Sequence, residues 1–357
     1  MSDGNPSPLS SLPPETNPSP GPSPPAVSSV RGDSADGQAG WAFPAAWQDT
    51  TRMGSPYSFM RLPLTRDLAL ADLVVVGLPF DLGVNHRPGA RFGPRGIRTG
   101  SAQIRQYPMN ADGLWGPFRR LRVVDYGDLD LVNAYIETAV AQIEAGLTPI
   151  FAAGVVPIAL GGDHTVTLPA LRAAAKMHGP LALVHFDAHP DFWPPPAPER
   201  PYHHGTVYRI AAAEGLIDLS RSVQVGIRGT MSAMVVEDAR AAGFALITAD
   251  EFCDLGVAET LRQIQARATG KVYVSLDIDC ADPAFAPGTG TPEVAGLSSR
   301  ELVQLVRGLR GLDFAGFDLV EVSPPYDQSE ITAMLAAHCV YEFIELVAAG
   351  WGEGPRA

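Results

Sequence analysis

The sequence predicts a three-layer α/β/α domain built on an approximately eight-stranded, mostly parallel sheet. From about residue 72 onward, short apolar runs rich in β-branched residues alternate with longer stretches whose apolar residues recur at helical spacing. Hydrophobic residues make up 46% of the chain and charged residues 18%, so there is enough apolar material for a large buried core. Parallel strands need crossover connections and covering on both faces, so the alternation places helices on both sides of the sheet.

The expected strands are the short buried runs, and the expected helices are the amphipathic stretches between them. In chain order the strands are Asp72–Leu78, Leu121–Asp125, Val155–Leu160, Leu181–Phe186, Val223–Ile227, Phe244–Ile247, Lys271–Leu276 and Gly316–Val322. The helices cover residues 134–152, 168–176, 258–268, 299–310 and 330–348. In such sheets the ligand site lies beyond the carboxyl ends of the strands, so the residues after each strand are the candidates for chemistry.

The first part of the chain has a different composition. Residues 1–30 contain nine prolines and eight serines with almost no large apolar side chains, so they cannot bury enough surface to offset the entropy of ordering. We expect a disordered tail over residues 1–40, with a proline-rich docking peptide as the weaker alternative, and a single catalytic domain over residues 41–357.

Charge and cysteine content narrow the class of protein. The chain has 26 Lys and Arg against 39 Asp and Glu, a formal charge of −13, which disfavours nucleic acid and suits a cationic small molecule. Cys253, Cys280 and Cys339 are too few for a disulfide framework and fit a reducing cytoplasm. The apolar stretch Ile150–Leu160 is about half as long as a membrane span, so we expect a cytoplasmic protein without a membrane partner.

Three strand ends carry six possible metal ligands. His164 follows the strand at 155–160, and Asp187, His189 and Asp191 follow the strand at 181–186, while Asp277 and Asp279 follow the strand at 271–276. Residues two apart in an extended chain face the same side and can converge. A single Asp-x-His-x-Asp pattern at a strand end is more often a helix cap or a group of surface residues than a metal site. Four buried carboxylates together, however, would repel one another unless cations neutralised them. Oxygen ligands with two imidazoles favour two ions such as Mn²⁺, with Ni²⁺, Co²⁺ or Fe²⁺ as alternatives, over structural zinc.

These motifs, in this order, resemble the ureohydrolases, the family of arginase and agmatinase. The resemblance extends over about residues 56–347, and Phe59-Met-Arg61 with Arg87-Pro-Gly-Ala-Arg-Phe-Gly-Pro94 is closer to the agmatinase branch. It rests on Gly-Gly-Asp-His at 161–164, Phe-Asp-Ala-His-Pro-Asp at 186–191, His-Gly-Thr at 204–206, Ser-Leu-Asp-Ile-Asp at 275–279, Ala-Pro-Gly-Thr-Gly-Thr-Pro at 286–292 and Glu-Val-Ser-Pro at 321–324.

The resemblance implies a role for each of these positions. One metal would bind His164, Asp187, Asp191 and Asp277, and the other Asp187, His189, Asp277 and Asp279. Two such ions can share and activate a water. Glu321 would bind the guanidinium group and His204 would shuttle a proton, although Glu321 could instead be a structural ion-pair partner and His204 a surface histidine.

The substrate is the part of the function that the sequence leaves open. Agmatine is the nominal substrate, and guanidine, N-alkylated guanidines, the biguanide metformin and guanidino acids are alternatives. Asn85, His86, Pro190 and Trp193 lie in segments that depart from the common family pattern. We expect Asn85, His86 and Trp193 to contact the substrate. The loop that contains Trp193 could instead pack at a subunit contact. The resemblance also implies trimers or hexamers. A non-catalytic subunit of a hetero-oligomer is the competing class, but it should have lost ligands.

Overall fold

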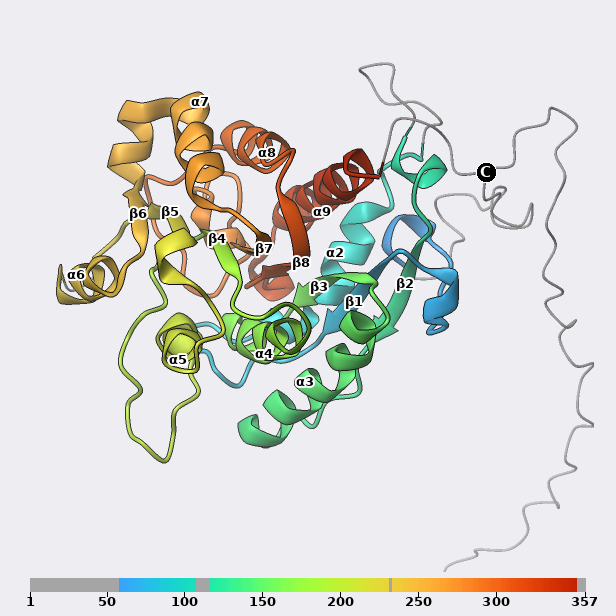
Figure 1. The fold of residues 1–357 in the computed structure, drawn as a ribbon, viewed down its shortest axis with the longest axis horizontal. Helices are drawn as coiled ribbons and strands as arrows, with labels where there is room; N and C mark the ends of the chain where they lie inside the picture. The colour runs from blue at the N-terminus through green and yellow to red at the C-terminus, as the bar shows by residue number, and fades with distance from the viewer. Residues whose placement is uncertain (1–57, 107–115, 231–232, 352–357) are drawn as a thin grey trace, which may run out of the picture.

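The computed structural model describes residues 58–106, 116–230 and 233–351. The tail expected at residues 1–40 lies outside these residues. In the described part the chain forms an eight-stranded sheet with the order β2-β1-β3-β8-β7-β4-β5-β6, and every strand pair is parallel. Helices cover both faces (Figure 1). The three-layer fold predicted from the sequence is confirmed.

The eight strands match the apolar runs of the sequence to within a few residues. They are β1 (Leu73–Leu78), β2 (Val123–Asp128), β3 (Val156–Gly161), β4 (Ala182–Phe186), β5 (Val223–Ile227), β6 (Ala245–Thr248), β7 (Lys271–Asp277) and β8 (Asp313–Val320). Strands β1, β4 and β5 are buried along their whole length. Continuous apolar runs therefore form strands here because both faces of the sheet are covered.

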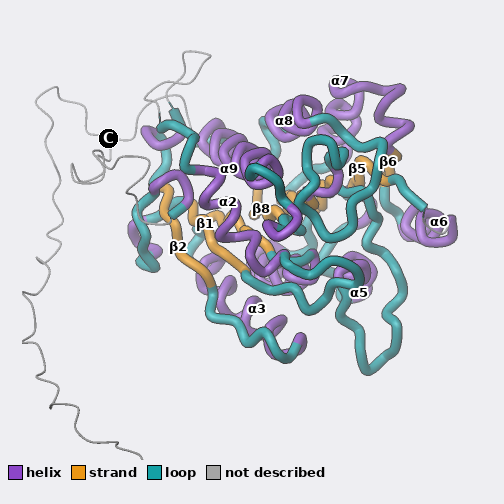
Figure 2. The backbone as a smooth tube through the Cα atoms, turned by 180° about the vertical axis from the view of Figure 1, so that it is seen from behind, coloured by secondary structure: helices purple, strands orange, loops and turns teal. Residues whose placement is uncertain are grey.

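Two hydrophobic cores flank the sheet. One core joins the sheet to α2 (Gly93–Ser101), α7 (Ala249–Arg267), α8 (Ser299–Gly308) and α9 (Ile331–Ala349). The other joins the opposite face to α3 (Ile136–Ala152), α4 (Thr167–His178), α5 (Val207–Ala213) and α6 (Ala233–Ala242). Seen from behind, the strands run between these two helical layers (Figure 2).

Three helices, α2, α5 and α6, were not predicted, and α7 begins nine residues before its predicted start. Helix α2 contains three glycines and a proline, which lower its helix propensity, and α5 has only seven residues. Gly256 has a φ of 71° inside α7, which breaks the apolar periodicity at that point. A capping box of Thr248 and Glu251 nevertheless starts the helix at residue 249.

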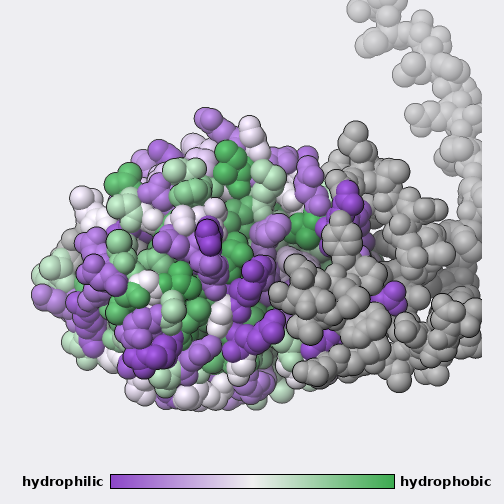
Figure 3. Space-filling view, turned by 90° about the horizontal axis from the view of Figure 1, so that it is seen from above, coloured by the Kyte–Doolittle hydropathy of each residue, from purple (hydrophilic) through white to green (hydrophobic). Residues whose placement is uncertain are grey.

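Helix α9 corrects one expectation about apolar stretches. By length and composition it could cross a membrane, unlike Ile150–Leu160, yet 78% of its most apolar window is buried inside the domain. Phe343 stacks on Phe317 of β8, with ring centroids 4.3 Å apart. On the face in Figure 3, hydrophobic side chains occur in small clusters among hydrophilic ones. Helix α9 is thus a core helix of the described domain.

The strand order brings the predicted ligands to one place. Strands β3, β8, β7 and β4 are consecutive neighbours in the sheet. Their carboxyl ends meet at the same edge because the strands are parallel. Asp277 is the last residue of β7, and the segments that follow these four strands carry the other five metal ligands proposed from the sequence, together with Glu321 after β8 and His204 in the segment between β4 and α5.

Candidate metal centre

His164 lies at the centre of the first group of predicted ligands. Its Nδ1 atom is 3.2 Å from Asp187 Oδ2, 2.8 Å from Asp191 Oδ2 and 3.2 Å from Asp277 Oδ2. All four side chains are buried. This Nδ1 atom makes no hydrogen bond of acceptable geometry despite these short distances. An imidazole nitrogen aimed into three carboxylates in this way is the arrangement expected around a shared cation.

His189 lies at the centre of a second group. Its Nδ1 atom is 3.1 Å from Asp279 Oδ2 and 3.4 Å from Asp187 Oδ1. Asp187 therefore presents one carboxylate oxygen to each histidine. The structure brings all six predicted ligands together in two adjacent groups that share this residue.

The ligands converge through tight turns, whereas the sequence predicted convergence through strand alternation. Strand β4 ends at Phe186, before the first of its ligands. Asp187 Oδ1 accepts the backbone N–H of His189 at 2.6 Å, and Asp277 Oδ1 accepts the N–H of Asp279 at 2.9 Å. Short side chains that bond to the backbone two residues later form such turns. Asp191 adopts a left-handed φ of 44°, which turns the loop back toward His164.

The buried negative charges of this cluster favour the binding of cations. Burial, together with the charges of Asp279 and Asp187, raises the pKa of Asp277 well above its usual range. Burial opposes the charged form of His189, but Asp279 and Asp187 outweigh it and raise the pKa of His189 to about 12. The cluster thus holds an excess of buried negative charge, and divalent ions would neutralise it. Hard oxygen donors with two imidazoles and no thiolate fit such ions.

Glu321 lies beside the first group, directly after β8. Its Oε1 atom accepts the backbone N–H of His164 at 2.9 Å and lies 2.9 Å from His204 Nδ1. Its Oε2 atom is buried and has no hydrogen-bond partner. Burial opposes the charged form of His204, but Glu321 outweighs it and raises the pKa of His204 to about 9. One carboxylate oxygen is therefore held by the protein while the other is free to accept a donor.

The loop after β1 packs against this pair. Asp163 Oδ2 accepts the backbone N–H of Gly83 at 2.7 Å, and the carbonyl of Gly83 accepts the N–H of His204 at 3.1 Å. Asn85 and His86 follow on the same loop and are exposed. These two predicted substrate residues lie two and three positions after Gly83, whose carbonyl contacts the backbone of His204.

Trp193 lies at the outer side of the second group. Its ring centroid is 6.3 Å from that of His189, and both residues are partly exposed. Glu293 approaches the same histidine, with Oε1 3.9 Å from His189 Nε2. Arg228 fixes the segment of Glu293 by donating to the carbonyls of Asp279 and Glu293 at 2.8 and 2.7 Å. Glu293 was not singled out from the sequence, because no local motif signals its position.

A buried polar network behind His164 was also not predicted from the sequence. His164 Nε2 lies 2.9 Å from the hydroxyl of Tyr208 and 3.0 Å from Ser275 Oγ. Ser275 donates to Asp318 Oδ1 at 2.6 Å, and Tyr273 donates to Asp318 Oδ2 at 2.9 Å. Because Ser275 gives its proton to Asp318, its oxygen is available to accept from His164 Nε2, which leaves Nδ1 facing the carboxylates.

Comparisons with known proteins agree with this geometry. The arginase family, described by a family-wide sequence profile, matches residues 71–345. The chain is 42% identical over 290 residues to a mitochondrial guanidino acid hydrolase of Homo sapiens, which covers 80% of this chain and 81% of the relative. It is 43% identical over 290 residues to a mitochondrial agmatinase of Gallus gallus, covering 80% and 84%. The solved proclavaminate amidino hydrolase of Streptomyces clavuligerus superposes with a TM-score of 0.81 at 42% identity, over 84% of this chain and 99% of that one.

Proposed function

The chain belongs to the arginase family, and from this membership we propose that it cleaves the guanidino C–N bond of a small guanidino compound to give urea, or a substituted urea, and an amine. It is a hydrolase that acts on carbon–nitrogen bonds. The family depends on a binuclear metal centre. The observation that carries the proposal is the pair of ligand groups sharing Asp187, with the unpartnered Glu321 Oε2 beside them.

We propose that two divalent ions are held by the six clustered side chains. The first ion would be bound by His164, Asp187, Asp191 and Asp277, and the second by Asp187, His189, Asp277 and Asp279. When bound, the two ions would supply Lewis acidity that makes a water nucleophilic at neutral pH. Mn²⁺ is the proposed ion and Ni²⁺ the alternative, because this donor set does not by itself separate them.

Glu321 is the proposed anchor of the substrate guanidinium. A guanidinium group is planar and offers N–H donors that pair with carboxylate oxygens through charge-assisted hydrogen bonds. Oε2 is the free acceptor, while the hydrogen bond from His164 N–H keeps Oε1 in place. This arrangement would orient the guanidinium carbon toward the ligand cluster.

His204 is the proposed proton donor to the departing amine. The raised pKa keeps its imidazole charged at neutral pH, and Nδ1 is held by Glu321. Its Nε2 atom would then be the atom that gives up a proton. The backbone N–H of His204 donates to the carbonyl of Gly83, which fixes the main chain of His204 beside the proposed guanidinium site.

The substrate is proposed as agmatine, a guanidino compound with a distal amine. The partly exposed carboxylate of Glu293 near His189 and the chain's formal charge of −13 support a cationic substrate. Trp193, Asn85 and His86 are proposed to line the path of the substrate tail. Guanidino acids are the alternative that the name of the human relative favours, and guanidine or alkylated guanidines such as metformin remain further candidates.

We propose that the protein works in the cytoplasm as a trimer or hexamer. The low cysteine count supports a reducing compartment. The relatives from Homo sapiens and Gallus gallus bear mitochondrial names, so a mitochondrial location is the competing assignment.

A urea-release panel tests the proposed function. The metal-loaded protein is assayed with agmatine, guanidine, dimethylguanidine, metformin, guanidinobutyrate and arginine. Highest kcat/KM on agmatine would support the nominal substrate, and highest turnover of guanidinobutyrate would move the assignment to guanidino acids. Absence of urea, of a substituted urea and of a released amine with every compound would contradict the activity itself.

A further inference from the structure

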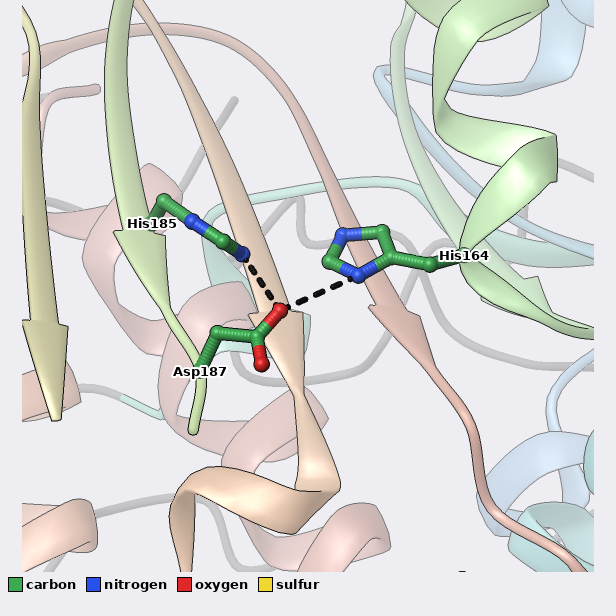
Figure 4. A group of neighbouring side chains, drawn as sticks. All are labelled: His164, His185 and Asp187. Atoms are coloured by element: carbon green, nitrogen blue, oxygen red, sulfur yellow. Dashed lines mark hydrogen bonds and ion pairs between the residues drawn. The ribbon is translucent and has the colours of Figure 1, made fainter. Parts of the chain in front are cut away.

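His185 touches the shared carboxylate without belonging to either predicted ligand set. It lies on β4 two residues before Asp187, and its Nε2 atom is 2.7 Å from Asp187 Oδ2. Figure 4 shows His185 and His164 approaching the same carboxylate oxygen from opposite sides. The side chains of all three residues are buried. On distances alone His185 could be a metal ligand, because a ring nitrogen of His185, a ring nitrogen of His164 and a carboxylate oxygen of Asp187 all lie within 4.8 Å of one another.

The hydrogen bonds of Gln224 indicate whether His185 binds a metal or only donates to Asp187. It is the register partner of His185 on β5, and it is fully buried. Its Nε2 atom lies 2.7 Å from the carbonyl oxygen of Pro190 and 3.1 Å from His185 Nδ1. A carbonyl only accepts hydrogen bonds, so the atom facing Pro190 must be the amide nitrogen. The two N–H groups of that amide are then directed at Pro190 and at His185.

The direction of each hydrogen bond follows from this orientation. Because Gln224 donates to His185 Nδ1, this nitrogen must carry a lone pair, and the ring proton must lie on Nε2. His185 Nε2 therefore donates to Asp187 Oδ2 and has no lone pair for a metal. We infer that Gln224 and His185 are positioning residues that orient the shared carboxylate of Asp187, and that His185 is not a metal ligand. The inference rests on the proposed binuclear centre.

Two further features indicate that Gln224 acts on the centre rather than on the core alone. Its Oε1 atom is buried without a hydrogen-bond partner, and such an atom destabilises the folded state. An apolar side chain at this position would avoid that cost. Its bond to Pro190 also holds the loop between His189 and Asp191, where Asp191 has its left-handed backbone. One amide thus supports both the shared ligand and the loop that carries two others.

The test compares metal binding of the full chain with two changes at Gln224. Gln224→Glu keeps the shape but replaces the donor with an acceptor, and Gln224→Met removes both donors at similar volume. The dissociation constants for Mn²⁺ are measured by calorimetry on the metal-stripped protein, and the visible spectrum is recorded with Co²⁺. We expect Mn²⁺ binding weaker by about 10- to 100-fold, as is typical for partners of metal ligands, with an altered Co²⁺ spectrum.

Ser222→Ala is the matched control. Ser222 precedes Gln224 by two residues, is fully buried, accepts the N–H of Leu183 and donates to the carbonyl of Asp218. Its loss should lower the melting temperature while the Mn²⁺ constants stay within twofold of the wild type. His185→Phe completes a double-mutant cycle with Gln224→Met, and we expect the double variant to bind Mn²⁺ no more weakly than the worse single variant.

The outcomes separate this inference from the proposed function. Mn²⁺ constants within twofold of the wild type in both Gln224 variants would overturn the inference, as would additive losses in the cycle. Failure of both Gln224 variants to fold would assign the residue to the core and would also overturn it. Failure of the wild type to bind Mn²⁺ or Co²⁺ would instead contradict the proposed metal centre.

Discussion

The imidazole Nδ1 of His204 lies 2.9 Å from Glu321 Oε1, and the other oxygen of Glu321 has no partner. One carboxylate therefore holds the proposed proton donor and leaves an acceptor for the substrate cation. This places the proposed anchor and acid on the same side of the ligand cluster, since Oε1 also accepts the N–H of His164.

Removing the charge of Glu321 should damage catalysis more than metal binding. Glu321→Gln keeps the size of the side chain but replaces a charge-assisted pair with a neutral one. Truncating one partner of a buried charged pair costs about 2–5 kcal/mol, so we expect kcat/KM to fall by about 30-fold or more. Steady-state urea release checks this, and elemental analysis should find unchanged metal content. Glu259→Gln, on the exposed side of α7, is the control and should retain full activity.

The His204–Glu321 pair should make the stability of the metal-free protein depend on pH. The pKa of His204 is raised to about 9 in the folded state, from about 6.5. Its stabilising contribution is therefore complete below pH 6.5 and is lost as the pH rises through 9. Each pKa unit corresponds to about 1.4 kcal/mol, so the contribution is on the order of 3 kcal/mol. Urea unfolding of wild type and His204→Asn should differ at pH 6 by more than at pH 10; an equal difference at both values would refute the pairing.

The lack of a side chain at Gly290 should leave space for the substrate guanidinium beside Glu321. A Cβ atom at this position would lie 3.1 Å from the carbonyl oxygen of Arg87 and 3.4 Å from Glu321 Oε2. Gly290→Ala would thus place a methyl group next to the free oxygen. We expect KM for the preferred guanidino compound to rise by about tenfold or more, with metal affinity unchanged. An unchanged KM would mean that the guanidinium group does not occupy this space.

A buried ion pair outside the ligand cluster should contribute strongly to the stability of the β2 edge. Arg98 donates to both carboxylate oxygens of Asp125, at 2.8 and 2.9 Å, and both residues are buried. Arg98→Ala would leave the Asp125 charge uncompensated, so we expect the free energy of unfolding to fall by about 3–5 kcal/mol. Urea titration measures the loss. Arg262→Ala removes an exposed pair with Glu259 and should cause no measurable change.

The sequence predicts the strands and most long helices because burial on both faces leaves continuous apolar runs. It does not predict α2, whose glycines and proline obscure helical spacing although the helix packs tightly against α9. Tertiary packing overrides local propensity at this helix.

The ligand cluster could be anticipated because its residues follow strands whose ends meet at one edge. His185 was within reach of the same reasoning, since it lies two residues before Asp187 on β4. Gln224, Asp318 and Glu293 were not, because only the strand register and the loop paths bring them to the site. Their contributions depend on contacts between distant segments, for which a single sequence carries no local signal.

Titrating metal back into the stripped protein while recording urea release tests directly whether the chain is a binuclear metal hydrolase. We expect no activity without metal, an increase with added Mn²⁺, and saturation at about two ions per chain. Asp187→Ala should remain folded and inactive at every metal concentration. Full urea release from the stripped protein, or from Asp187→Ala, would contradict the binuclear hydrolase.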